Sequence, residues 1–545
     1  MSAADNNKGL MARRVAAAVA QALRKKGVGR QLGVDERKMK DPRGNQLRRV
    51  FDELAMEKGK APLKNRRAGL AVINWLRAHG VIYVDRDNLT PEGIYWLDTR
   101  EKEARLRLVF NHEFNSLLAG KCGRNFADKP FQAARDWVVT SALDPESGIG
   151  QRAEMAMSWT TRGHGKNTIC YISKGCSLVK CSADGAFVVP MGTDGVLIPQ
   201  EAALPDWELT DISDSGTSPD ELPFIASSGL SKNERIVFSL YLTILCLLRP
   251  GEIPPLALEG APQSGKTTAL VEAGRLFYGD AFRAIDPNGK DAEAAIPRML
   301  SLFRLLVWDN LDNEHNLRGF VDRLAASTTG AASMEKTHYV NGKVTILPVQ
   351  AAQCLSAVNT DFLTRHSTLA SRLINLGWST PRTEFNLQSV REETRAKRSS
   401  TLSFIARTIS KTIAEFDPEE KVSFRFDCWQ RFYNACARVM QCEHVAKEAF
   451  ADVMKRSQER GLAADKYGAA LLQALRPGES RTGVAGEIFD RVKQFLPQEG
   501  NSSSYELSAW LRNMTAHVAR GLSVQIAGRD KHLKQNIFIV SRNAD

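Results

Sequence analysis

The stretch that most constrains the fold is residues 256–270, LALEGAPQSGKTTAL. A short apolar run ends in Gly260, a loop with Pro and Ser follows, and Gly265, Lys266 and Thr267 open a segment of helical character. The pattern G-x-x-x-x-G-K-T between a strand and a helix is typical of a loop that binds nucleotide phosphates. It predicts a strand over 256–258, a helix over 267–277 and an α/β fold with a parallel sheet.

The chemistry of such a loop assigns roles to its residues. Backbone N–H groups of the loop and of the helix N-terminus face the phosphates, where the helix dipole favours negative charge. Lys266 would reach the β- and γ-phosphates, and the Thr267 hydroxyl would coordinate Mg²⁺. A nucleoside triphosphate with Mg²⁺ is therefore the expected ligand, and ATP is the one that the resemblance described below implies. The expected cofactor-binding residues are Gly260, Gln263, Ser264, Gly265, Lys266, Thr267 and Thr268.

A second apolar run, LFRLLVWDN, is expected to bring an acidic residue to the carboxyl edge of the same sheet. This residue is Asp309, the candidate for the carboxylate on the Mg²⁺ side. The alternative is a strand-end Asp that only starts a turn. An acid that polarises water would ordinarily follow, yet position 310 is Asn. Asp312 or Glu314 could serve instead, or Asn310 itself could position the water.

Two further segments supply polar residues near strand ends. The run QCLSAVN ends in Asn359, which could sense the γ-phosphate and orient water, or could merely form a turn. Arg365 and Arg372 flank HSTLAS before the apolar run RLINLGW. Either arginine could reach the γ-phosphate of a neighbouring subunit as a finger, a role that requires an oligomer. The alternative is an arginine in an ordinary surface ion pair.

Between the second acidic segment and Asn359 lies THYVNGKVTIL. Asn341-Gly342 between alternating apolar residues predicts a β-hairpin. Cations and aromatic rings on such a hairpin can hold a nucleic-acid backbone, whereas the alternative is a structural edge hairpin. Its cationic and aromatic residues are Lys336, His338, Tyr339 and Lys343.

The charge of the chain is concentrated at one end. The 545 residues carry a formal net charge of +12, and residues 1–70 hold 18 Lys or Arg against 7 Asp or Glu. Such a module suggests a polyanionic partner, of which nucleic acid is the usual one, although a solvated basic face is the alternative. The most apolar run, residues 237–248, is too short to span a bilayer and predicts a buried helix. With no signal peptide apparent, we expect a cytoplasmic protein.

Composition and periodicity divide the chain into five parts. Residues 1–104 predict a basic, winged-helix-like DNA-binding domain, in which the hairpin sequence GVIYVDRDNLTPEGIYWL follows a helix. Residues 105–223 predict a small β-rich collar domain and a linker. Residues 224–390 predict the ATPase domain, 391–478 a helical domain and 479–545 a second winged helix.

The order of LALEGAPQSGKTTAL, RLLVWDNLDN, THYVNGKV, CLSAVN and LASRLINLGW resembles the AAA+ helicase-like ATPases of phages and other mobile elements, relatives of the superfamily-three and MCM replicative helicases. The similarity covers about 200–390. It implies a ring, commonly a hexamer, that hydrolyses ATP between subunits and pulls DNA with a hairpin before the first sensor. By position it implies Asn359 as the first sensor, Arg372 as the finger and Lys343 as the hairpin-tip lysine.

The resemblance also bears on the remaining questions. The Asp-Asn pair after the second strand occurs in these relatives, so Asn310 fits the pattern. Many relatives carry a primase module, and none is recognisable in this sequence, so a separate primase or replication factor is a candidate partner. The expected function is an ATP-dependent DNA helicase or translocase. The alternatives are a non-unwinding remodelling, loader or defence ATPase and an origin-binding or transcriptional regulator assembled by nucleotide.

Overall fold

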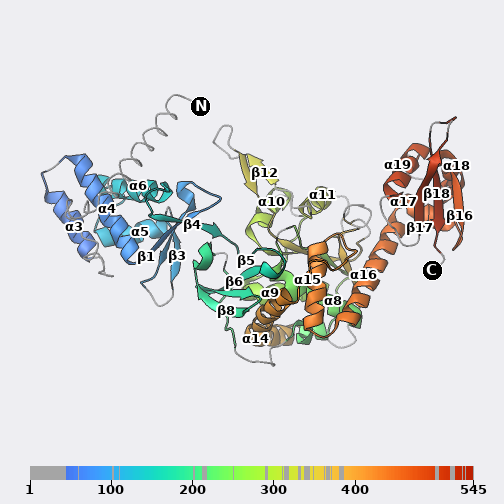
Figure 1. The fold of residues 1–545 in the computed structure, drawn as a ribbon, viewed down its shortest axis with the longest axis horizontal. Coiled ribbons are helices and arrows are strands. Elements are labelled where there is room, and N and C mark those ends of the chain that lie inside the picture. The colour runs from blue at the N-terminus through green and yellow to red at the C-terminus, as the bar shows by residue number, and fades with distance from the viewer. Residues whose placement is uncertain are drawn as a thin grey trace. The chain divides into compact units, whose positions relative to one another are not determined.

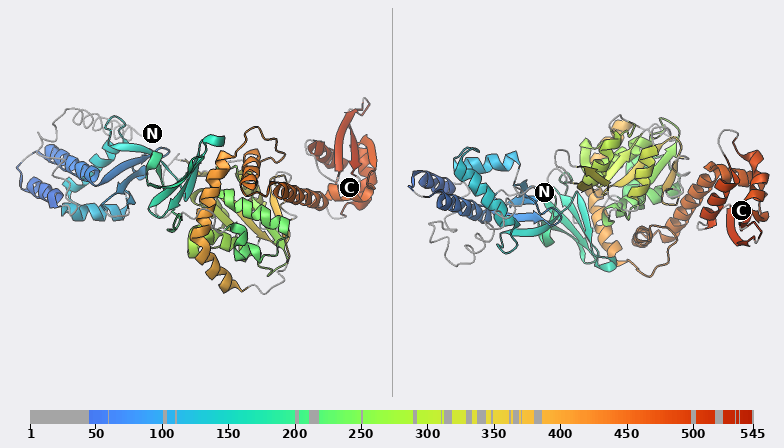
Figure 2. Two further views of the ribbon diagram at one scale, coloured as in Figure 1. Left: turned by 60° about the horizontal axis from the view of Figure 1, so that its bottom comes forward. Right: turned by 90° about the horizontal axis from the view of Figure 1, so that it is seen from above.

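The computed structural model describes residues 45–543, apart from residues 59, 101–103, 110, 200–202, 211–217, 250, 289–291, 310, 312–317, 329–332, 337–343, 348, 361–362, 364–368, 370, 380–385, 498–501, 516–521, 531 and 534. The chain divides into two compact units. The first contains the chain up to Trp159 with Tyr171–Lys180 and Phe187–Asp206, and the second contains Thr160–Cys170, Cys181–Ala186 and the chain from Trp207 onward. Figures 1 and 2 show the elements along the chain.

The first unit combines four described helices with a five-stranded sheet of order β3-β2-β1-β4-β9. The expected hairpin is present, because β1 and β2 pair antiparallel. The helices are α3 (Asn45–Met56), α4 (Ala61–Ala78), α5 (His112–Cys122) and α6 (Lys129–Leu143). The strands are β1 (Gly80–Asp85), β2 (Ile94–Asp98), β3 (Arg105–Leu108), β4 (Gly150–Met155) and β9 (Val196–Leu197).

One apolar core joins these helices to the sheet. It contains Trp75 of α4, Trp96 of β2, Phe114 of α5 and Val138 of α6, all at most 1% exposed. Residues on both sides of position 104 therefore share this core. The segment for which we expect β structure from residue 105 accordingly contains two helices, and strands dominate it from Gly150 onward.

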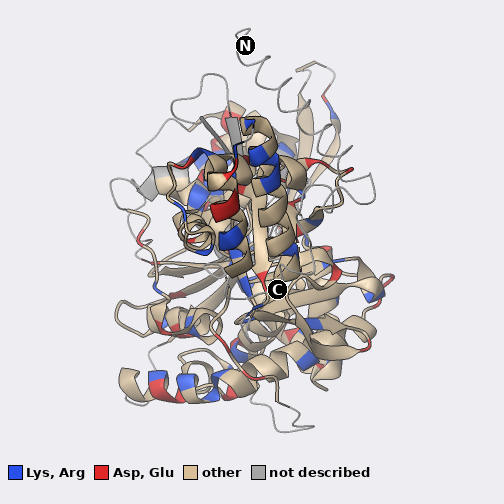
Figure 3. Ribbon diagram, turned by 90° about the vertical axis from the view of Figure 1, so that its left-hand side faces the viewer, with Lys and Arg blue, Asp and Glu red and all other residues tan. Residues whose placement is uncertain are grey.

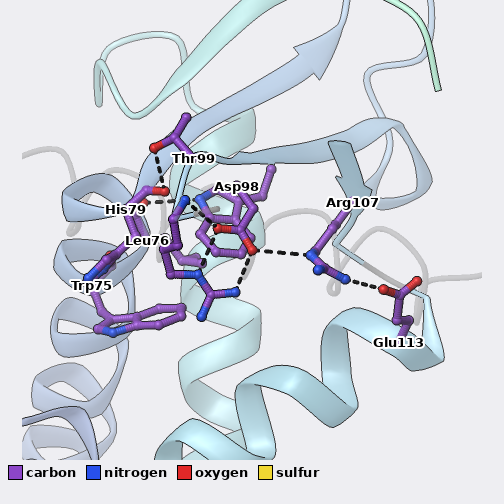
Figure 4. Close-up of polar contacts among 9 residues, drawn as sticks. Trp75, Leu76, His79, Asp98, Thr99, Arg107 and Glu113 are labelled. Carbon is purple, nitrogen blue, oxygen red and sulfur yellow. Dashed lines mark hydrogen bonds and ion pairs between the residues drawn. The ribbon is translucent and has the colours of Figure 1, made fainter. Parts of the chain in front are cut away.

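A buried carboxylate fixes the hairpin of the first unit against the helices (Figure 4). Asp98 is 2% exposed and accepts hydrogen bonds from Arg100 and Arg107. Arg107 also pairs with Glu113 of α5, and the Arg100 guanidinium lies over the ring of Trp75. Burial acts to raise the pKa of Asp98, but the hydrogen bonds from Arg100 and the charges of both arginines outweigh it, so this pKa is lowered.

A separate four-stranded sheet has the order β5-β6-β7-β8. Its short strands confirm the β-rich pattern expected for this stretch of sequence. They are β5 (Trp159–Arg162), β6 (Ile169–Lys174), β7 (Ser177–Ser182) and β8 (Gly185–Pro190).

The second unit is built on a parallel sheet of order β11-β14-β10-β15. The expected α/β class with a parallel sheet is thereby confirmed. The strands are β10 (Leu256–Gly260), β11 (Leu305–Trp308), β14 (Ala352–Ala357) and β15 (Ile374–Trp378). An antiparallel pair, β12 (Ser333–Lys336) with β13 (Val344–Leu347), lies between β11 and β14 in the sequence.

Helices surround this sheet and continue after it. Arg398 donates to the carbonyls of Leu276 and Phe277, the last turn of α9, and so ties α14 to α9. The buried helix expected over 237–248 is present as the end of α8 and a following 3-10 turn. The helices are α7 (Pro223–Ala226), α8 (Lys232–Ile244), α9 (Lys266–Tyr278), α10 (Ala292–Leu302), α11 (Arg318–Ser327), α14 (Leu387–Ala414), α15 (Asp427–Val439) and α16 (Glu443–Ala464). Among the described residues, no helix has the length and apolar character to cross a membrane.

The last part of the chain has its own core. Phe538 of β18 and Leu507 and Leu511 of α19 are fully buried in it. Strand β16 joins β18 and β17 in an antiparallel sheet of order β16-β18-β17. The elements are α17 (Lys466–Ala474), β16 (Ser480–Val484), α18 (Ala485–Val492), α19 (Ser504–Thr515), β17 (Leu522–Arg529) and β18 (Asn536–Arg542).

Candidate nucleotide-binding site

The parallel sheet brings three chain segments to one edge. Strand β14 lies between β10 and β11, with Leu258 opposite Ser356 and Val307 opposite Cys354. All strands run in the same direction, so their carboxyl ends meet at the edge where ligands of parallel α/β sheets bind. The segment after β10 is the predicted phosphate loop. Asp309 follows β11, and Asn359 follows β14.

The backbone of the loop explains its two glycines, Gly260 and Gly265. A Cβ atom at Gly260 would overlap the Trp378 carbonyl of the neighbouring strand. Gly265 has φ 96° and Gln263 has φ 58°, both in the left-handed region that glycine adopts most easily. The Trp378 indole donates to the Ser264 carbonyl at 2.8 Å, which fixes the loop to β15. The loop thus has a defined shape at the N-terminus of α9.

The predicted lysine lies inside this loop. Lys266 is 5% exposed and its Nζ donates to the carbonyls of Gly260 at 2.8 Å and Ala261 at 2.6 Å. It is also the first residue of α9, so its ammonium and the N-terminal N–H groups of that helix face the same small region. This arrangement suits an anion with several oxygens, such as a polyphosphate. Thr268 follows on the first turn of α9 and is half-buried.

Oxygen atoms gather beside the lysine. The Thr267 hydroxyl donates to Asp309 Oδ1 at 2.7 Å and lies 2.9 Å from Ser356 Oγ. Carboxylate and hydroxyl oxygens are the ligands that Mg²⁺ prefers, together with phosphate oxygens and water. The donor set of Thr267 and Asp309 therefore fits a magnesium ion, and Ser356 extends it. Sequence reasoning missed Ser356, although it is a polar residue in a strand that is otherwise mostly apolar.

A second polar cluster lies at the same edge of the sheet. Glu259 Oε2 accepts from Thr360 Oγ1 at 2.5 Å and from Asn375 Nδ2 at 2.8 Å, and Asn375 Nδ2 also lies 2.6 Å from Thr360 Oγ1. Thr360 directly follows Asn359, whose side chain is exposed. The cluster joins β10, β15 and the segment after β14. Sequence reasoning passed over all three residues. The available signals were a Glu directly before Gly260 and an Asn within an apolar strand.

The candidate finger has a different environment. Arg372 is 4% exposed and donates to Thr328 Oγ1 at 2.6 Å and to the Ala325 carbonyl at 3.3 Å, at the C-terminal end of α11. Burial, together with the charge of Arg425, lowers the pKa of Arg372. The guanidinium is hydrogen-bonded within its own subunit, and an inter-subunit role would require it to leave these partners.

Several predicted site residues cannot be placed. Asn310, His338, Lys343 and Arg365 lie outside the described residues, as do Asp312 and Glu314. Lys336 ends β12, but its side chain is also outside the description. Within the described part of the chain, no group of three His, Cys, Asp or Glu side chains could hold a metal ion.

Comparisons with known proteins give limited similarity. No family model matches this chain, and no curated protein matches it by sequence. Among solved structures, one described as an active helicase, SCCmec type IV Cch, is 11% identical with a TM-score of 0.46, over 85% of this chain and 93% of that one. An apo structure of the NrS-1 C-terminal region (residues 305–718) is 8% identical with a TM-score of 0.36, over 85% of this chain and 96% of that one. TM-scores below 0.5 assign no family, so a functional proposal depends on the site itself.

Proposed function

We propose that this protein is an ATP-dependent DNA helicase or translocase of a phage or mobile element. The observation that carries the proposal is the convergence of Lys266, Thr267 and Asp309 at the carboxyl edge of a parallel sheet. An ammonium inside a helix-terminal loop binds phosphate oxygens, and the adjoining carboxylate and hydroxyl bind the magnesium ion that accompanies them. Mg²⁺, when bound, neutralises charge on the β- and γ-phosphates.

The proposal extends to the AAA+ class and to a ring. In such a ring the nucleotide lies between subunits, Asn359 senses the γ-phosphate and Arg365 or Arg372 reaches it from the neighbour. The antiparallel pair of β12 and β13 is the base of a hairpin whose Lys336, His338 and Lys343 contact DNA. The antiparallel pairing supports the hairpin, and the DNA contacts rest on the positions of these cations in the sequence.

We assign DNA contacts outside the ring to two further regions. In the first unit, Arg48 and Arg49 of α3 and Lys58 and Lys60 between α3 and α4 are exposed, and Figure 3 colours the charged residues along the ribbon. At the other end of the chain, the order helix, strand, helix, helix, strand, strand supports a winged helix. In it α19 is the recognition helix, and β17 and β18 form the wing.

The proposal is tested by ATP hydrolysis measured with and without DNA. We expect hydrolysis that DNA stimulates and that Lys266→Ala abolishes, and we expect strand separation on a forked substrate to be lost in Lys343→Ala. The particle mass with a slowly hydrolysed ATP analogue and DNA tests the ring. A protein that stays monomeric with every ligand, or that has no affinity for ATP, would contradict the proposal.

The environment of Arg372 favours a second candidate, a non-unwinding ATPase that remodels or loads a partner on DNA. Arg372 would have to break its hydrogen bonds to Thr328 and Ala325 before it could reach a neighbouring subunit. Such a step in every cycle fits an ATPase that turns over slowly as a switch better than a processive motor. Steady-state and single-turnover hydrolysis on long DNA separate the two. A motor turns over many times per binding event, whereas a switch hydrolyses about once.

A further inference from the structure

Two carboxylates, Asp309 and Glu259, lie near the carboxyl ends of the two strands that flank β14. Asp309 follows β11 and accepts from Thr267, on the side expected to hold magnesium. Glu259 is in β10, directly before Gly260, the first glycine of the phosphate loop. The Gly260 carbonyl accepts a hydrogen bond from Lys266 Nζ, and Glu259 is the residue before Gly260. A hydrolytic site also needs a group that orients or deprotonates the attacking water, and a second carboxylate can serve in that role.

The surroundings of Glu259 hold its side chain toward the predicted sensor. Thr360, which donates to Glu259 Oε2, is the residue after Asn359. In the strand register Asn375 is opposite Ala257 and Gly377 is opposite Glu259, so Glu259 and Asn375 project from the same face of the sheet. The hydrogen bonds from Thr360 and Asn375 hold the Glu259 carboxylate in place, and a proton acceptor needs a fixed position.

The cluster also contains an unused acceptor. Asn375 is 5% exposed, and its Oδ1 is buried with no hydrogen-bond partner among the residues that the structure describes. Buried amide oxygens are nearly always paired, with protein or with ordered water. The unpaired Oδ1 beside Glu259 is therefore a place where a water molecule can donate, next to a carboxylate that can accept from the same water.

We propose that Glu259 is the general base of the hydrolysis put forward above, in place of the acid that position 310 lacks. The inference rests on that proposed function. The water oxygen bonds to the γ-phosphorus while Glu259 accepts the proton, and the bond between that phosphorus and the bridging oxygen breaks. The electron pair leaves with ADP, and the proton passes from Glu259 to the released phosphate. Thr360 and Asn375 are positioning residues, which act through Glu259.

The test is Glu259→Gln in the full-length protein. The amide oxygen of Gln still accepts from Thr360 and Asn375, so the fold of the cluster is kept while the base is removed. We expect single-turnover ATP hydrolysis to fall at least about 100-fold, the scale of general-base catalysis. The dissociation constant for ATP, measured by calorimetry, and the melting temperature should stay the same, and the bound nucleotide should remain ATP by chromatography.

A second pair of variants tests the positioning role. Thr360→Val removes the hydroxyl that donates to Glu259, and Thr360→Ser restores it. We expect hydrolysis to fall about tenfold in the first, the scale of one lost neutral hydrogen bond, and to return in the second, with ATP affinity unchanged in both.

The outcomes separate this inference from the proposed function. If the wild type hydrolyses ATP, Lys266→Ala does not, and Glu259→Gln is as active as the wild type, Glu259 is not the base while the proposed function stands. Loss of ATP affinity together with hydrolysis in Glu259→Gln would show a structural role and overturn the inference. Loss of hydrolysis in Asp312→Asn or Glu314→Gln, with Glu259→Gln active, would do the same. A wild type without ATPase activity would refute both.

Discussion

The hydrogen bond between Trp378 and the phosphate loop yields a quantitative prediction for Trp378→Phe. The indole is 3% exposed and donates to the Ser264 carbonyl at 2.8 Å. Phe keeps most of the apolar contact but removes the donor, which costs about 1–3 kcal/mol when a buried acceptor is left unpaired. If this whole free-energy cost disorders the loop in the unbound protein, the dissociation constant for ATP rises about 5- to 150-fold, since 1.4 kcal/mol is a factor of ten.

The measurement is isothermal titration calorimetry of a slowly hydrolysed ATP analogue. A matched control is Trp96→Phe in the first unit, because Trp96 is also fully buried and its indole also donates to a backbone carbonyl, that of Leu76, at 3.1 Å. The control should lose stability on a similar scale and keep its affinity for ATP. An affinity in Trp378→Phe within twofold of the wild type would refute the claim that this bond orders the loop.

Three further perturbations follow from the described contacts. Asp309→Asn should raise the Mg²⁺ concentration needed for hydrolysis at least about tenfold, because it removes the charged metal ligand; a titration with unchanged midpoint would contradict this. Gly260→Ala should abolish ATP binding, since its Cβ would overlap the Trp378 carbonyl; calorimetry checks it, with Gly486→Ala, where a Cβ meets nothing within 4 Å, as the control. Asp98→Asn should destabilise the first unit by about 3–5 kcal/mol at pH 7, because it removes the buried carboxylate that pairs with Arg100 and Arg107, although Arg107 keeps its contact with Glu113. The pKa of Asp98 is lowered in the folded state, so its contribution is present above the unfolded pKa and is lost as pH falls through the folded pKa. Hydrogen exchange in α4 should thus show a difference between wild type and variant at pH 7 that shrinks under strongly acidic conditions.

The fold around the parallel sheet could be predicted from the sequence because its signals are local. The strand before the loop and the helix after it are found at Leu256–Gly260 and Lys266–Tyr278, close to the predicted bounds. The apolar run before the loop, Gly265 with its positive φ and Lys266 at its fixed spacing are local features that specify this backbone. Helices α5 and α6 were missed even though Asn111 caps α5 and Gly123 ends it at φ 62°, both readable signals. Neighbouring β-rich runs outweighed them.

The polar partners of the site could not be read in the same way. Glu259, Thr360 and Asn375 come from three segments up to 116 positions apart, and only the strand order brings them together. Nor does the sequence tell whether Arg372 faces a neighbour or its own subunit. That depends on where the end of α11 lies, which is a matter of tertiary packing.

The order of strands also bears on synthesis of the chain. The central strand β10 is made long before both of its neighbours, β14 and β15. At about 5–20 residues per second, translation needs on the order of ten seconds to reach Trp378 after Gly260. During that interval an apolar strand has both hydrogen-bonding edges open. The nascent chain is therefore most prone to aggregation while this interval is being translated. A chain truncated before Trp378 would lack the hydrogen bond from its indole to the phosphate loop.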